Sequence, residues 1–185
     1  MLESTHSIDG GSLVPGTDFC KIFTEEMDRL YRLAFLLTAD SDKAEQCFVS
    51  GLGECVQGAA AFMEWAHSWA RRTVIKQAIR IIMPVPDHAG QGFVVNLSKA
   101  STSGRFNPMA AIIALGEFER FVFVMSILES QSEEECSTLL ECSRRDVLIA
   151  REVALRCLTH TRISCDGVVE GAGIPGSLVA QVCMH

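Results

Sequence analysis

The sequence lacks the features that most directly identify an enzyme or an exported protein. It contains no GxSxG, P-loop or HExxH motif, and its five histidines are scattered along the chain. The first stretch, MLESTHSIDGGSLVPG, has neither the basic start nor the apolar run of a secretory signal. We therefore expect a protein that is not an enzyme and that is cytoplasmic.

Uninterrupted apolar runs and closely paired cysteines are also missing. The most apolar window, residues 109–128, contains Glu117, Glu119 and Arg120, and charges at mid-segment are costly in hydrocarbon. None of the eight cysteines belongs to a CxxC pair, so the thiols are expected to be reduced and largely buried. We expect no metal, no cofactor and no membrane partner.

A net positive charge is absent as well. The formal net charge is −7, whereas nonspecific affinity for nucleic acid comes from clustered lysines and arginines. This excludes a protein whose whole surface binds polyanions, so any contact with DNA must be local. The 185 residues, 48% of them hydrophobic, are enough for one ordinary domain or two small ones.

Apolar residues in the first third of the chain recur at helical spacing. Two such sets flank the polar, cap-rich stretch TADSD at residues 38–42, which predicts two helices packed as an antiparallel hairpin. The first set comprises Phe23, Met27, Leu30, Ala34 and Leu37, and the second Ala44, Cys47, Phe48, Leu52, Cys55 and Val56.

A third helix, predicted over residues 62–82, concentrates positive charge in this acidic chain. It carries four bases against one acid, Glu64, for a local charge of +3. Its bases are Arg71, Arg72, Lys76 and Arg80, the last three at a spacing of four that places them on one face. This row is either a solvated outer face or a contact surface for DNA. Trp65 and Trp69 are most simply core residues, and base stacking is the alternative.

The second half predicts another group of helices. Residues 83–107, rich in Pro, Gly, Ser and Thr, read as a linker ending in an Asn107 cap. The pairs Ser132 with Glu135 and Ser143 with Asp146 have the spacing of capping boxes, so they predict two helix starts. The predicted apolar wedge between these two helices consists of Leu139, Leu140, Val147, Ala150 and Ala154.

The predicted fold class is therefore all-α, with two small helical modules joined by a linker. The expected boundaries are a flexible leader at 1–18, a first module at 19–82, the linker at 83–107, a helix-turn-helix module at 108–160 and an irregular tail at 161–185.

The order of these parts resembles the small extracytoplasmic-function sigma factors of bacterial RNA polymerase. LYRLAFLLTADSDKAEQCF looks like the family's first hairpin, and EWAHSWARRTVIKQAIR looks like its tryptophan-bearing basic helix. ERFVFVMSILESQSEEECSTLLECSRRDVLIAREVAL resembles the C-terminal helix-turn-helix module. Together these segments cover roughly residues 20 to 158, and the specificity of the resemblance lies in their order and separation.

The resemblance implies a factor that binds core RNA polymerase and promoter DNA, with an anti-sigma or other regulatory protein as a further partner. It implies that Asp42 and Glu45 contact the polymerase clamp. The DNA-binding residues that it implies are Arg71, Arg72, Lys76 and Arg80 at the upstream promoter element and its melted strand, and Ser143, Arg144, Arg145 and Arg151 at or near the recognition helix.

Several positions depart from the family pattern. The turn position usually held by glycine is Glu141, and the recognition helix has Leu148 and Ile149 where polar or basic groups are expected. Residues 129–156 contain seven acids against four bases, a local charge of −3 that opposes phosphate contacts. The alternative function is therefore a degenerate sigma-like protein that binds a protein partner, or itself, without reading DNA.

Overall fold

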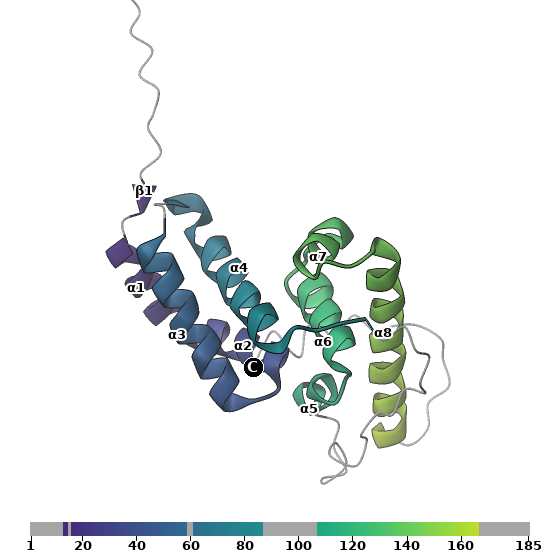
Figure 1. Cartoon of the computed structure of the whole chain (residues 1–185). Coiled ribbons are helices and arrows are strands. Elements are labelled where there is room, and N and C mark those ends of the chain that lie inside the picture. Colours follow the sequence, from purple (N-terminus) through teal and green to yellow (C-terminus); the bar gives the residue numbers. More distant parts are fainter. Residues whose placement is uncertain (1–12, 15, 59–60, 87–106, 167–185) are drawn as a thin grey trace, which may run out of the picture.

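The protein is all-α, as predicted (Figure 1). The computed structural model describes residues 13–14, 16–58, 61–86 and 107–166, with side chains within 18–58, 65–86 and 107–160. Apart from helices, this part of the chain contains one antiparallel pair of two-residue strands, β1 (Leu13–Val14) and β2 (Ala61–Phe62). The predicted linker and tail lie mostly outside the described residues.

The first group of helices begins earlier than predicted. It consists of α1 (Gly16–Glu25), α2 (Met27–Thr38), α3 (Ser41–Gln57) and α4 (Met63–Ile82). The helix α1 starts inside the predicted leader, so the boundary at residue 19 is too late. The prediction of a single helix from Phe23 to Leu37 is wrong, because the helix is interrupted at Glu26, between α1 and α2.

Most of the predicted core positions of this group are buried. Leu30, Ala34 and Leu37 line the inner side of α2, whereas Met27 is 52% exposed, because it lies at the break between α1 and α2. Asp40 caps α3 through the amides of residues 42 and 43, as the TADSD stretch predicts. Gly51 allows α3 to approach α4 closely, since a Cβ there would lie 3.3 Å from Val74 Cγ2.

The second group of helices is α5 (Pro108–Ile113), α6 (Glu117–Phe123), the π-helical turn η2 (Val124–Leu128), α7 (Glu133–Leu139) and α8 (Arg144–Asp166). Asn107 caps α5, and the capping box of Ser132 with Glu135 opens α7, both as predicted. The helix α8 runs six residues into the predicted tail, so the boundary at residue 160 is too early.

Helices α7 and α8 are joined by a short turn and pack against each other, as the two predicted helix starts imply. The predicted wedge lies between them, with Val147, Ala150 and Ala154 buried. Ser143 and Asp146 bond each other's backbone amides at the start of α8, which confirms the second capping box. Glu141 has φ 52°, the left-handed conformation expected at a position where glycine is usual.

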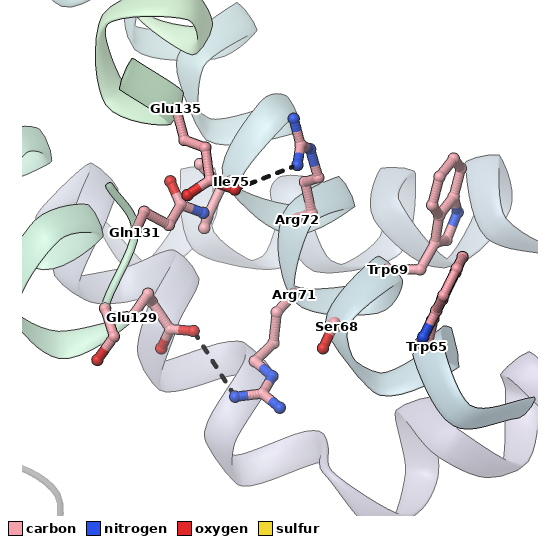
Figure 2. Close-up of a pocket in the computed structure, with 10 residues that line it drawn as sticks. Trp65, Ser68, Trp69, Arg71, Arg72, Ile75, Glu129, Gln131 and Glu135 are labelled. Atoms are coloured by element: carbon pink, nitrogen blue, oxygen red, sulfur yellow. Dashed lines mark ion pairs between the residues drawn. The ribbon is translucent and has the colours of Figure 1, made fainter. Parts of the chain in front are cut away.

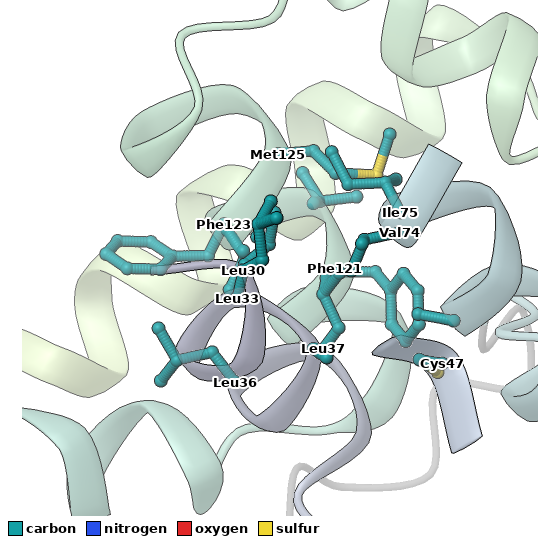
Figure 3. Packing of buried hydrophobic residues seen from close by; sticks show 14 of the residues in the cluster. Leu30, Leu33, Leu36, Leu37, Cys47, Val74, Ile75, Phe121, Phe123 and Met125 are labelled. Atoms are coloured by element: carbon teal, nitrogen blue, oxygen red, sulfur yellow. The ribbon is translucent and has the colours of Figure 1, made fainter. Parts of the chain in front are cut away.

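The two groups of helices share one hydrophobic core. The helix α2 packs against α5, α6 and η2 as well as against α3 and α4. Figure 3 shows Leu33 and Leu37 of α2 among side chains of both groups, including Phe121 and Met125. Two modules held apart by a tether would not bury these side chains together, so the groups form one packed unit within the described residues.

A buried arginine holds α2 and α6 together at this junction. Arg120 is 4% exposed, and its Nε donates a hydrogen bond to the carbonyl oxygen of Leu37 at 3.1 Å. Its Nη1 donates to the carbonyl oxygens of Leu115 and Ile113 at 3.1 and 3.4 Å. Burial lowers the pKa of this guanidinium.

No helix in the described ranges combines the length and apolar character needed to cross a bilayer.

Replacing Arg120 tests this junction. Arg120→Ala leaves three carbonyl oxygens without their donor, so we expect a loss of roughly 2–4 kcal/mol in the free energy of unfolding. Arg156→Ala, at an exposed position on α8, should cost about 0.5 kcal/mol or less. Urea unfolding followed by circular dichroism gives both values, and equal midpoints for the two variants would contradict the role assigned to Arg120.

Candidate functional site

The four bases on α4 are the positive surface that the sequence singles out, and three of them contact carboxylates. Arg80 pairs with Glu54 of α3 at 2.7 Å. Arg71 and Arg72 pair with acids of the other group of helices, Glu129 at 3.8 Å and Glu135 at 3.9 Å.

The fourth base, Lys76, lies over the indole of Trp69, with its Nζ 5.7 Å from the ring centroid. The prediction of DNA contact requires positive charge that is not compensated. In this conformation carboxylates compensate part of the charge of Arg71, Arg72 and Arg80.

The inter-group pairs of Arg71 and Arg72 lie in a cleft of about 360 Å³ between α4 and the segment leading into α7. We call it the α4 cleft; it is lined by Trp65, Ser68, Trp69, Arg71, Arg72, Ile75, Glu129, Ser130, Gln131 and Glu135. Figure 2 shows the two indoles at one end and the two ion pairs toward the other. The cleft therefore combines aromatic surface, cations and carboxylates.

Neither inter-group ion pair closes to hydrogen-bonding distance. At 3.8 and 3.9 Å the guanidinium and carboxylate groups attract each other electrostatically but do not form the short bidentate contact typical of strong arginine pairs. The Nε of Arg71 and the Oε1 of Gln131 are buried and have no hydrogen-bond partner. The cleft thus contains an unused donor and an unused acceptor.

The two carboxylates differ in their protonation equilibria. Burial raises the pKa of Glu129, with a smaller contribution from the charge of Glu26, and the nearby charges of Arg71 and Arg29 oppose this shift without cancelling it. Hydrogen bonds from Ser132 lower the pKa of Glu135, and Arg72 makes only a smaller contribution. Desolvation therefore outweighs attraction at Glu129, whereas the charge of Glu135 is stabilised mainly by its own helix cap.

The interpretation of the tryptophans as core residues is wrong. Trp65 is 66% exposed and Trp69 is 43% exposed, while Ala66 and Thr73 of the same helix are buried. The helical period alone is compatible with either the indoles or the small residues facing the core. In the structure the small residues, such as Ala66 and Ala70, are the buried ones. Two exposed indoles four residues apart place aromatic surface beside the cations of α4.

The start of α8 presents the second set of predicted DNA-binding residues. Ser143, Arg144 and Arg145 are exposed there. Arg144 pairs with Glu134 at 2.9 Å, and Arg151 pairs with Glu133 at 2.8 Å, both acids belonging to α7. Within the described part of the chain Arg145 makes no ion pair.

The apolar departures on this helix also face outward. Leu148 and Ile149 are 42% and 50% exposed, so they are not buried against the first group of helices. The predicted polymerase-binding residues Asp42 and Glu45 are exposed on the first turns of α3. The α4 cleft is lined neither by these residues of α8 nor by Asp42 and Glu45 of α3, so the structure does not bring the predicted sites together.

Sequence reasoning missed Glu129, Gln131 and Glu135 as neighbours of the basic helix. A signal was present in the opposite local charges of the two segments, +3 over residues 62–82 and −3 over residues 129–156. Opposite charges favour contact, but they do not say which side chains meet.

No protein-family model matches this chain, and no curated protein is significantly similar to it.

Substitution of Glu129 tests the cost of burying its charge. Because burial raises its pKa above the ordinary value of 4.5, the folded chain binds a proton at Glu129 more tightly than the unfolded chain does. The stability from this proton is complete below 4.5 and is lost as the pH rises through the raised pKa. We expect Glu129→Gln to gain stability relative to wild type as the pH rises above 4.5. Thermal unfolding measured below and above this pH checks it; a constant difference would contradict it.

Proposed function

We propose that this protein is a sigma-factor-like transcription initiation protein that binds core RNA polymerase and promoter DNA. The observation that carries the proposal is the exposure of Trp65 and Trp69 on the helix that also bears Arg72 and Lys76. Single-stranded nucleic acid is held by aromatic groups that stack on bases and by cations that contact phosphates, and α4 offers both. Stacking, the alternative raised for the indoles, requires the exposure that they have.

The helix-turn-helix formed by α7 and α8 supports the same function. A recognition helix contacts base edges through its N-terminal residues, and Ser143, Arg144 and Arg145 are exposed at the start of α8. Asp42 and Glu45, exposed on α3, are available to the polymerase. In this proposal α4 receives the melted strand and α8 contacts the duplex.

A second candidate function is a sigma-like protein that binds another protein. Leu148 and Ile149, on the recognition helix, favour it, because exposed apolar side chains lose contact with water when a protein covers them. The pairing of Arg71, Arg72 and Arg80 also favours it, since paired cations are less available to phosphate. An anti-sigma protein or another regulator would be the partner.

Binding to core RNA polymerase distinguishes the two candidates. We expect the full chain to co-elute with the core enzyme in size-exclusion chromatography and to bind it more tightly than duplex DNA. The variant Asp42→Asn with Glu45→Gln should reduce this binding, because it removes the two charges expected at the clamp. Absence of core binding by the wild type at low salt would contradict the first function and leave the second.

Transcription from reconstituted core enzyme tests α4. Arg72→Ala with Lys76→Ala removes two cations beside the tryptophans, and we expect promoter-dependent transcript to fall about tenfold. The matched control, Lys21→Ala with Arg156→Ala, removes the same charge from exposed positions on α1 and α8. Equal activity of the two double variants would show that α4 does not contact nucleic acid.

A further inference from the structure

Arg71 also lines a second, smaller cleft. It has a volume of about 120 Å³ and is lined by Arg29, Arg32, Leu33, Leu36, Arg71, Val124, Leu128 and Glu129. Arg71 and Glu129 line both this cleft and the α4 cleft, so the two spaces meet at their ion pair. Helix α2 therefore adds two guanidinium groups to the cations of α4.

More arginines than carboxylates line the two clefts, and the two kinds of charge come from different groups of helices. Four arginines line the two clefts, Arg29 and Arg32 from α2 and Arg71 and Arg72 from α4. Only two carboxylates line them, Glu129 and Glu135, and both come from the second group of helices. The charge of Glu26 also acts on Glu129, so four arginines from two helices gather here with three carboxylates nearby.

The carboxylates fill this positive site incompletely. Each lies 3.8 or 3.9 Å from its arginine, and the Nε of Arg71 is left buried without an acceptor. Phosphate oxygens bond well to guanidinium groups, and the successive phosphates of one strand can reach several guanidinium groups at once, which two carboxylates fixed on one segment do not do here. An anion of that kind would satisfy donors that Glu129 and Glu135 leave unused.

We propose that Arg29, Arg32, Arg71 and Arg72 form a phosphate-binding site, which Glu129 and Glu135 occupy as internal competitors in the structure described here. The inference rests on the proposed function, because the phosphates of a melted DNA strand are its natural ligand there. A free phosphorylated molecule shares the same chemistry. Binding of either displaces the two carboxylates from the arginines.

The contacts of the two carboxylates with the arginines are weak enough for a phosphate to replace them in this proposal. Desolvation of Glu129 outweighs its attraction to Arg71, so the charged contact adds little stability to the fold. Arg120, which joins α2 to α6, does not line either cleft. In this proposal the side chains of Glu129 and Glu135 turn away from the arginines, while the backbone bonds of residues 129 and 131 to η2 remain.

Removing the internal carboxylates tests the site. The variant Glu129→Gln with Glu135→Gln keeps the side-chain shapes, and Gln is accepted at the last position of a capping box, so α7 should still form. We expect this variant to bind a fluorescein-labelled single-stranded oligodeoxynucleotide about tenfold more tightly than wild type at low salt, measured by fluorescence anisotropy. Affinity equal to that of wild type would overturn the proposal.

Two further variants separate the site from a general change of charge. Glu25→Gln with Glu152→Gln removes the same charge from exposed pairs within single helices, and it should change the affinity less than about threefold. Arg29→Ala with Arg32→Ala, added to the Gln variant, should reverse the gain in affinity. An equal gain in the control, or a gain that survives loss of the two arginines, would overturn the site.

The source of the phosphate is identified by competition. Tripolyphosphate that displaces the oligodeoxynucleotide from the Gln variant would assign the site to free phosphorylated molecules as well as to nucleic acid. If the Gln variant binds the oligodeoxynucleotide more tightly but tripolyphosphate does not displace it, the site is assigned to the phosphates of the DNA strand. Core polymerase binding is measured on the same preparations: its absence counts against the transcriptional role alone, whereas unchanged affinity for DNA with intact core binding counts against the phosphate site alone.

Discussion

The relation between the two groups of helices depends on the buried guanidinium of Arg120. A cation removed from water requires acceptors on every side, and here they are backbone carbonyl oxygens of α2 and of the segment before α6. The bond from Arg120 to the carbonyl oxygen of Leu37, in the last turn of α2, ties α6 to the C-terminal end of α2. Since η2 follows α6 directly, this junction helps to place Glu129 beside α4.

Much of the fold follows from the sequence because its signals are local. The capping pairs at Ser132 and Ser143, the Asn107 cap and the period of the apolar residues each act within a few residues. The missed features are tertiary. The break at Glu26 interrupts a continuous apolar pattern, and the common core of the two groups depends on contacts between residues distant in sequence, such as Leu37 and Arg120.

The candidate site was only half predictable for the same reason. The basic row on α4 is visible in the spacing of its residues, but whether Trp65 faces the core or the solvent depends on which side of the helix meets α3. The contact of Arg71 with Glu129 joins residues far apart in the chain, and no local pattern specifies it. Charge complementarity between the segments indicated attraction but not geometry.

The double use of Glu135 has a consequence for how the molecule could change state. Its carboxylate bonds Ser132 at the start of α7 and also faces Arg72, and the first of these interactions is the stronger. If Arg72 moves away, the carboxylate of Glu135 keeps its hydrogen bond from the Ser132 amide, so the start of α7 stays capped. In the proposed exchange of anions beside Arg72, α7 would therefore not need to melt.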